Sequence, residues 1–403
     1  MISAATYYKR NISKALKAAS RAYKVLLLTG PRKVGKRTLL QELGGEDRRY
    51  VTLADGEALR LAKEDPLQFF QAYPTPVYID EVQKAPNLLM HIARMVKKSR
   101  KKGQVWLSST RKLHLLPEVS RALAGQMVEL RLQGLSQKEK QHVAQSSPFM
   151  PLAPQRSRRV KITQQEAYEH IVRGANPEVW SDAPPENYYA GYVASYLEQE
   201  VREMIQVSNE TVFMRFLRSL ALRTGQLLNY DSVARDVGVS PPTIKNWVSV
   251  LEDSGLVYLL PPYSENVPHR VIKTPKMYFL DTGLCCYLCG IASAEEAQNS
   301  PMSGGLFVTY VISEVLKSYW NQGLEPSVYF YRNAYQREIS LLIENGGKLW
   351  PVEIVQSKVA DLHMIRNFSM LDPALCERGA LVCLADKLKP LSREVLTMPV
   401  GYI

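Results

Sequence analysis

A glycine-containing turn between an apolar run and a helical pattern constrains this 403-residue chain more than any other feature. Residues 24–29 read Lys-Val-Leu-Leu-Leu-Thr, an apolar run of strand length, and residues 38–43 read as the start of a helix. The turn between them, residues 30–36, reads Gly-Pro-Arg-Lys-Val-Gly-Lys and fits the first part of the pattern G-x-x-x-x-G-K-[S/T]. A strand, a glycine loop and a helix in this order predict a phosphate-binding loop (P-loop).

The chemistry of such a loop assigns a role to each position. The glycines let backbone N–H groups surround phosphate oxygens, the positive end of the following helix faces the same anions, and Lys36 reaches the β and γ oxygens. The predicted nucleotide-binding residues are Gly30, Pro31, Arg32, Lys33, Val34, Gly35, Lys36, Arg37 and Thr38. The alternative left open by the motif alone is a strand–turn–helix whose glycines serve packing only.

Position 37 departs from the pattern, because a Ser or Thr hydroxyl there normally binds magnesium. Arg37 has no acceptor atom to offer a metal ion. Thr38 does not simply replace the hydroxyl, since one step along a helix turns a side chain by about 100°. Arg37 can instead contact phosphate directly as a charged donor, in which case nucleotide binding survives while magnesium binding weakens.

A second motif follows about fifty residues later. Residues 77–80 read Val-Tyr-Ile-Asp, an apolar strand that ends in Asp80 and Glu81. In P-loop ATPases an acid at this position holds magnesium, and a neighbouring side chain orients the attacking water. Asp80 is therefore the candidate magnesium ligand, and Asp80 with Glu81 forms the candidate catalytic pair if hydrolysis persists.

Strands and helices alternate through the first 142 residues, with further apolar strands predicted at residues 50–53, 105–108 and 128–132. This alternation predicts an α/β fold with a mostly parallel sheet covered on both faces. Residues 143–160 are rich in proline, serine and arginine and predict a linker or mobile loop.

Residues 161–268 form a predicted helical region. Within it, residues 231–251 have the pattern of a helix–turn–helix, in which Gly238 makes the turn and Ser240 caps the second helix. Residues 256–260 then supply a wing-like strand, so we expect a winged-helix-like domain. From residue 269 to residue 403 the pattern returns to mixed helices and strands.

Longer motifs resemble one group of prokaryotic proteins, the AAA+-like predicted ATPases whose C-terminal half is a domain of unknown function with a restriction-nuclease-like fold. The group's loop GPRQVGKTTLL is similar to GPRKVGKRTLL at residues 30–40, and its IDEIQ.AP is similar to IDEVQKAP at 79–86. Further similarity lies at 223–229, 273–284 and 351–354. The resemblance runs from the first helix to the end of the chain and implies a P-loop domain, a winged-helix-like domain and a nuclease-like α/β domain.

Several positions depart from this group's pattern. Its third strand ends LTGS where this chain has Leu-Ser-Ser-Thr at 107–110, which places Ser108 or Thr110 near the γ-phosphate by analogy. Its SLAGR is replaced by a sequence ending in Gln126, so an arginine that would sense phosphate is lost. Of the three acids that a nuclease-like site needs, the resemblance places Val308 and Ser340 at two, and Glu353 is the one that remains. We therefore expect a degenerate site without nuclease activity.

The charge of the chain is uneven. Residues 1–160 contain 30 basic and 12 acidic side chains, whereas residues 161–403 contain 21 and 27. This asymmetry predicts an anionic partner for the first half, which can be a nucleotide, nucleic acid or an acidic protein surface. Residues 195–265 contain six basic and nine acidic side chains, which favours a protein partner or an interdomain role for the helix–turn–helix. We expect a cytoplasmic protein without a membrane span, because the N-terminal residues are polar and no apolar stretch reaches about 20 residues.

These observations support one leading function and two alternatives. The leading function is an ATP- or ADP-binding regulatory or interaction switch with weak or absent hydrolysis, in which Mg²⁺ is left open. The first alternative is a pseudoenzyme scaffold that binds no nucleotide, with Arg37 filling the phosphate pocket. The second is an active ATPase that acts on nucleic acid.

Overall fold

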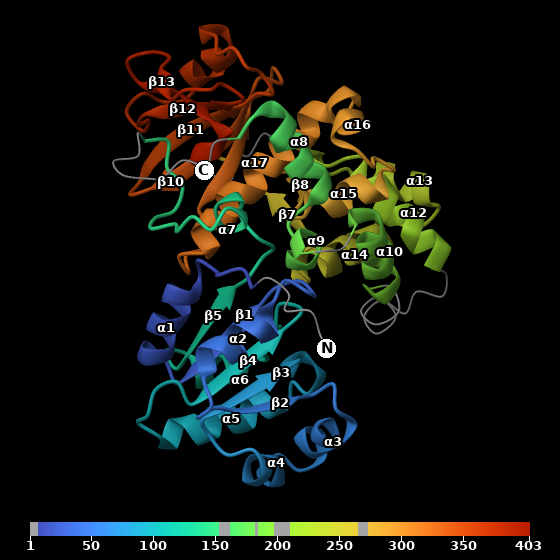
Figure 1. Cartoon of the computed structure of the whole chain (residues 1–403), viewed down its shortest axis with the longest axis vertical. Coiled ribbons are helices and arrows are strands. Elements are labelled where there is room, and N and C mark those ends of the chain that lie inside the picture. The colour runs from blue at the N-terminus through green and yellow to red at the C-terminus, as the bar shows by residue number, and fades with distance from the viewer. Residues whose placement is uncertain (1–6, 153–161, 182–183, 197–209, 265–272) are drawn as a thin grey trace.

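The computed structural model describes residues 7–152, 162–181, 184–196, 210–264 and 273–403 (Figure 1). The blue and cyan N-terminal region lies at one end of the molecule, and the green-to-orange middle region and the red C-terminal region lie together at the other end. Among the described residues, no helix has both the length and the apolar character needed to cross a membrane.

The predicted parallel sheet of the N-terminal region is confirmed. All five strands are parallel, in the order β2-β3-β4-β1-β5. Strand β4 therefore lies between β1 and β3 in the sheet. The strands are β1 (Val25–Thr29), β2 (Arg49–Thr52), β3 (Val77–Asp80), β4 (Val105–Ser109) and β5 (Met127–Arg131). The helices are α1 (Ser13–Ala22), α2 (Lys36–Gly44), α3 (Gly56–Glu64), α4 (Pro66–Ala72), α5 (Leu88–Lys98), α6 (Pro117–Leu123) and α7 (Gln137–Lys140).

Side-chain alternation in β1 explains why both faces of this sheet are covered. Leu26 and Leu28 point into a core shared with α1 and α2, whereas Val25 and Leu27 point into a core shared with α3, α4, α5 and α6. An apolar run without polar alternation is what a strand buried on both faces requires. Because these strands are parallel, the carboxyl ends of β1, β3 and β4 lie at one edge of the sheet, where the candidate site lies.

The middle region is mainly helical and ends in a small sheet. Its helices are α8 (Gln164–Arg173), α9 (Pro177–Ser181), α10 (Pro185–Tyr196), α12 (Glu210–Ala221), α13 (Tyr230–Val237), α14 (Pro241–Asp253), α15 (Thr282–Leu288) and α16 (Ala294–Asn299). Its strands, in the order β6-β8-β7, are β6 (Gln226–Leu227), β7 (Val257–Leu260) and β8 (Lys276–Phe279). The predicted helix–turn–helix segment forms α13 and α14, with Gly238 in the left-handed conformation between them and the Ser240 side chain accepting from the N–H of Thr243.

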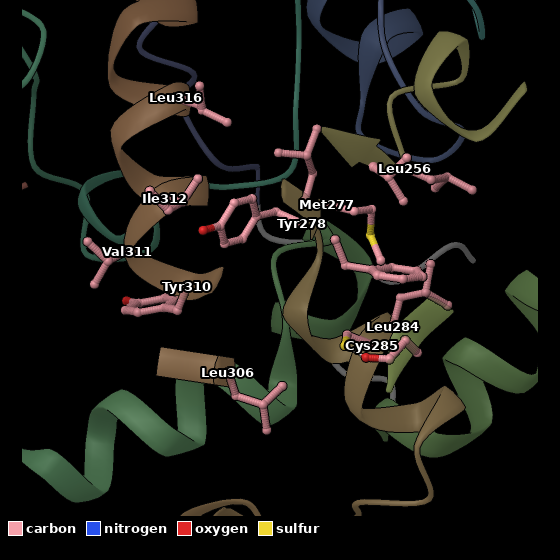
Figure 2. Packing of buried hydrophobic residues seen from close by; sticks show 14 of the residues in the cluster. Leu256, Met277, Tyr278, Leu284, Cys285, Leu306, Tyr310, Val311, Ile312 and Leu316 are labelled. Carbon is pink, nitrogen blue, oxygen red and sulfur yellow. Dashed lines mark hydrogen bonds between the residues drawn. The ribbon is translucent and has the colours of Figure 1, made fainter. Parts of the chain in front are cut away.

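The position of β8 differs from the boundary expected at residue 269. This strand pairs antiparallel with β6 and β7, so it completes the sheet of the middle region. Figure 2 shows Met277 and Tyr278 of β8 among buried side chains between α15 and the long helix α17 (Ser303–Trp320). The pairing joins segments that lie apart in the sequence, which a local pattern does not reveal.

The C-terminal region is a mixed six-stranded sheet in the order β13-β14-β12-β11-β10-β9. Its strands are β9 (Val328–Arg332), β10 (Glu338–Asn345), β11 (Lys348–Ile354), β12 (Gly379–Cys383), β13 (Lys389–Pro390) and β14 (Val395–Pro399). Helix α17 packs within one core that the middle and C-terminal regions share. Part of the predicted linker, residues 153–160, lies outside the described residues, but Phe149 is buried and bonded to Ser318 and Tyr319 of α17, so this part of the segment is anchored.

Candidate functional site

The predicted P-loop connects the carboxyl end of β1 to α2, and its glycines occupy positions that other residues would not tolerate. A Cβ on Gly30 would lie 1.9 Å from the carbonyl oxygen of Leu132, so the backbones approach too closely for a side chain. Gly35 has φ of +93° at the N-cap of α2, and Lys33 has φ of +60° within the loop. Positive φ at Gly35 suits a residue without Cβ, so the glycines shape this turn and do more than fill a packing gap.

Lys36 is buried inside the loop that it follows. Its Nζ donates to the carbonyl oxygens of Gly30 and Pro31, at 2.6 and 2.7 Å. These bonds hold the ammonium group against the loop backbone, and Lys36 is only 6% exposed. A phosphate in that position would give the same ammonium group a charged acceptor, which makes a stronger hydrogen bond than a neutral carbonyl.

A buried ion pair supports the loop from outside. Arg10 donates to the carbonyl oxygens of Val34 and Gln133, at 2.8 and 2.6 Å, and its Nε lies 3.1 Å from Glu139 Oε1. Glu139 also accepts from the N–H groups of Asn11 and Ser136. Because both charges are buried and well bonded, this pair fixes the position of the loop relative to the segment that follows β5.

Asp80 lies at the carboxyl end of β3, as predicted, and its carboxylate accepts from three hydroxyl groups. The donors are Tyr50 at 3.3 Å, Tyr78 at 3.1 Å, and Ser108 at the end of β4. Burial raises the pKa of Tyr78, and the charge of Asp80 raises it further. Burial and Asp80 also raise the pKa of Tyr50, while Arg37 lowers it. Both phenols therefore remain protonated donors.

Glu81 follows Asp80 in a left-handed backbone conformation, with φ of +60°. Its Oε2 accepts a hydrogen bond from Gln83 Nε2, which also donates to Thr110 Oγ1 at 3.0 Å. Non-glycine residues rarely adopt this conformation, and such outliers cluster at functional sites. Glu81 and Thr110 therefore lie at the same edge of the sheet as Asp80, joined by one amide side chain.

Arg37 does not enter the loop. The side chain is exposed, and its guanidinium carbon lies 4.6 Å from the ring centre of Tyr50, whose hydroxyl reaches Asp80. Thr38 is also exposed. The interior of the loop is occupied by Lys36, so the prediction that Arg37 fills the phosphate pocket in the scaffold alternative is wrong.

The middle region covers the outer side of the loop. Lys33 Nζ lies 3.4 Å from Glu178 Oε2 of α9 and 5.3 Å from the ring centre of Tyr188 of α10. Pro31, Arg32 and Val34 line a small pocket closed by Tyr188 and other residues of the middle region. Among the residues that the structure describes, the buried Tyr188 hydroxyl has no hydrogen-bond partner.

A second contact comes from the end of the helix–turn–helix. The backbone N–H of Lys112, just after β4, donates to the carbonyl oxygen of Asp253 at 2.8 Å, and His114 Nε2 lies 2.6 Å from the Asp253 carboxylate. Gln133 Nε2 donates to the carbonyl oxygen of Gly255 at 3.3 Å. The turn between α14 and β7 therefore rests on the same sheet edge as the P-loop.

Gln126 occupies the opposite edge of the sheet. Its carbonyl oxygen accepts from the N–H groups of Lys24 and Val25, at the start of β1. The P-loop follows the other end of β1, so a side chain at position 126 does not face the phosphate position of its own chain. The position of the expected phosphate-sensing arginine therefore lies away from the P-loop of the same chain.

Glu353, the residue predicted to remain from a nuclease-like site, lies on β11. Ser340 of β10 donates to Glu353 through its hydroxyl, at 2.6 Å, and through its N–H, at 3.3 Å. Burial raises the pKa of Glu353 to about 7. Nearby, Lys276 of β8 is paired with Glu338, which lies 3.8 Å from Arg332. Within the described residues, no cluster of three potential metal-binding side chains occurs.

Several residues of the P-loop site were missed from sequence. Arg10 and Glu139 are separated by 129 positions, and Tyr50 and Asp80 by 30. The tyrosine at position 50 lies in a predicted strand, where an aromatic residue is ordinary. No local pattern marks these residues, because their roles arise from strand order.

Comparisons with known protein families find three successive matches along the chain. A model of an AAA domain matches residues 22–140, a domain of unknown function (DUF8612) matches 164–295, and a second domain of unknown function (DUF4143) matches 303–403. The AAA match contains the P-loop, Asp80, Glu81 and the buried Glu139.

Among full-length relatives, uncharacterized protein Rv2008c of Mycobacterium tuberculosis is 24% identical over 408 residues, which cover 100% of this chain and 86% of that protein. Uncharacterized protein Mb2031c of Mycobacterium bovis gives the same values. Among solved structures, the Walker-type ATPase PABY2304 of Pyrococcus abyssi aligns at 12% identity with a TM-score of 0.43, over 70% of this chain and 96% of that chain. The chain therefore combines an N-terminal region that matches an AAA domain and contains the P-loop and the parallel sheet with a C-terminal region that matches DUF4143.

Proposed function

We propose that this protein is a nucleotide-dependent switch: ATP or ADP binds at the P-loop, and binding alters the contact between the N-terminal and middle regions. The observation that carries the proposal is that one short loop serves both purposes. Its concave side holds Lys36 against Gly30 and Pro31, whereas its outer side contacts Glu178 and lines the pocket beside Tyr188.

Phosphate binding would rearrange the inner side of this loop. Lys36 would exchange two neutral carbonyl acceptors for phosphate oxygens, which releases the carbonyl groups of Gly30 and Pro31. Pro31 also lies against the turn that contains Gly255, since a Cβ on that glycine would approach Pro31 Cδ to 3.2 Å. A change in the loop backbone at Pro31 therefore reaches the middle region without an intervening element.

Several observations support weak hydrolysis in this proposal. Arg37 replaces the hydroxyl that normally binds magnesium, and Glu81, the candidate residue for orienting water, is bonded to Gln83. The winged-helix-like segment has an interdomain role in this account, because Asp253 and Gly255 rest on the N-terminal region. We also propose that the C-terminal domain is a degenerate nuclease, since Glu353 stands alone among the three acids required.

Hydrogen exchange of the full chain with and without ATP tests the switch. We expect ATP to slow exchange at residues 30–36 and to change exchange at residues 186–192 and 253–257, and we expect Lys36→Ala to abolish both effects. Protection confined to the loop would show binding without a switch. Unchanged exchange at saturating ATP and at saturating ADP would favour the scaffold alternative.

A further inference from the structure

The P-loop site lacks a clear place for the magnesium ion that accompanies nucleotides in P-loop ATPases. Two protein groups normally hold that ion, a hydroxyl directly after the loop lysine and an acid at the end of a neighbouring strand. The first position is Arg37, which has no acceptor atom. The second, Asp80, is present, so its hydrogen bonds decide whether the residues fit the metal.

The hydrogen bonds of Asp80 leave little capacity for a metal ion. An ionised carboxylate offers about four acceptor positions. Tyr78 and Ser108 donate to Oδ1, and Tyr50 donates to Oδ2. Because Asp80 is only 8% exposed and these hydroxyls surround it, a magnesium ion would have to displace part of this network. The residues present therefore do not fit the ion.

A protein cation occupies the neighbourhood instead. Arg37 lies in the first turn of α2, directly after Lys36, and its guanidinium group stacks over Tyr50 at 4.6 Å. The hydroxyl of that tyrosine donates to Asp80. The ring of Tyr50 thus positions a permanent positive charge on the Asp80 side of the loop, and a guanidinium group binds phosphate oxygens through paired donors.

Building on the proposed nucleotide site, we propose that binding there is independent of magnesium, because Arg37 supplies the charge that the metal supplies elsewhere. The side chain is exposed and held by one ring face, so it can turn toward a bound polyphosphate without breaking a buried contact. The chemical class of ligand is a free nucleoside di- or triphosphate rather than its magnesium complex.

Calorimetric titration of the full chain with ATP and ADP, in EDTA and in excess Mg²⁺, tests this inference. We expect the wild-type Kd in EDTA to stay within about threefold of its value in Mg²⁺. Arg37→Thr, which restores the motif hydroxyl, should weaken binding in EDTA by about tenfold to a hundredfold, the range for a lost charged hydrogen bond. Magnesium should restore binding to that variant only in part, because Asp80 stays bonded to Tyr50, Tyr78 and Ser108.

A matched control removes an equal charge elsewhere. Arg121 is exposed on α6, which covers the other face of the sheet, and Arg121→Thr should leave both affinities unchanged. Wild-type binding that requires Mg²⁺, or equal affinities of wild type and Arg37→Thr in EDTA, would overturn the inference while leaving the switch intact. Absence of binding in both buffers would instead overturn the nucleotide site itself.

Discussion

The P-loop and the Glu353 site both depart from the sequence patterns that they resemble, but different kinds of residue are replaced in each. The P-loop keeps its backbone, with Gly30, Gly35 and Lys36 in place, and changes one side chain at its rim. At the Glu353 site, the nuclease-like group that this chain resembles implies acids at two further positions, which are Ser340 and Val308 here. Anion binding by backbone N–H groups survives substitution, whereas metal chemistry depends on particular carboxylates.

The charges around the two sites differ in the same way. Arg10 and Glu139 are both buried beside the P-loop, and their hydrogen bonds hold the loop in place. Lys276 and Glu338, beside Glu353, join the middle sheet to the C-terminal sheet, and Glu338 is partly exposed with Arg332 nearby. The Arg10–Glu139 pair supports the P-loop. The Lys276–Glu338 pair instead neutralises the carboxylate of Glu338, which lies near Glu353.

The largest expected effect comes from breaking the buried pair under the P-loop. Arg10→Met leaves Glu139 buried without its cation, and loss of one partner of a buried pair costs about 3–5 kcal/mol. Urea denaturation should show this decrease in the free energy of unfolding. The double variant Arg10→Met, Glu139→Gln should cost less than the sum of the single variants, and additivity would contradict a direct interaction.

A glycine substitution separates backbone shape from side-chain chemistry. Gly30→Ala places a Cβ 1.9 Å from the Leu132 carbonyl oxygen, so we expect a loss of roughly 3 kcal/mol, as for strain at a special backbone position. Gly45→Ala, at φ of +63° in open space, should cost about 1 kcal/mol. Equal losses, measured as unfolding free energies, would show that the close approach is not a constraint.

The raised pKa of Glu353 should make the free energy of unfolding depend on pH. The folded pKa of about 7 lies above the ordinary value of 4.5, so the folded state binds the proton more tightly than the unfolded state. Wild type should therefore lose about 3 kcal/mol of stability relative to Glu353→Gln as pH rises from 4.5 to about 8, with no further change above that range. A difference that is constant with pH would contradict the buried carboxyl.

The smallest effect concerns the pair beside that site. Lys276→Met removes a cation from Glu338, but this carboxylate remains partly exposed and 3.8 Å from Arg332. We expect a loss of about 1 kcal/mol, well below that for Arg10→Met. Thermal unfolding of both variants in one buffer compares them directly, and equal losses would remove the energetic distinction between the two sites.

Much of the fold followed from local sequence. The apolar run before Gly30 and the Val-Tyr-Ile-Asp strand ending at Asp80 placed two strands correctly, because strands buried on both faces need no polar alternation. The helix–turn–helix segment was readable for a similar reason, since Gly238 and Ser240 act on their immediate neighbours.

The remaining features depend on contacts between distant segments. Arg10 and Glu139 are 129 positions apart and meet only in the folded N-terminal region. Tyr50 reaches Asp80 because β2 pairs with β3. The same limit applies to Gln126, whose sequence position suggested a phosphate sensor but whose place at the start of β5 faces the opposite sheet edge. Strand order, rather than residue type, decides these roles.

A crystal structure of the full chain grown with ATP in EDTA tests the central claim most directly. The account predicts a polyphosphate within residues 30–36, with Lys36 Nζ moved from the carbonyl oxygens of Gly30 and Pro31 to phosphate, and Arg37 turned from Tyr50 toward the ligand. A loop without ligand at saturating ATP, with Lys36 still bonded to both carbonyls, would contradict it.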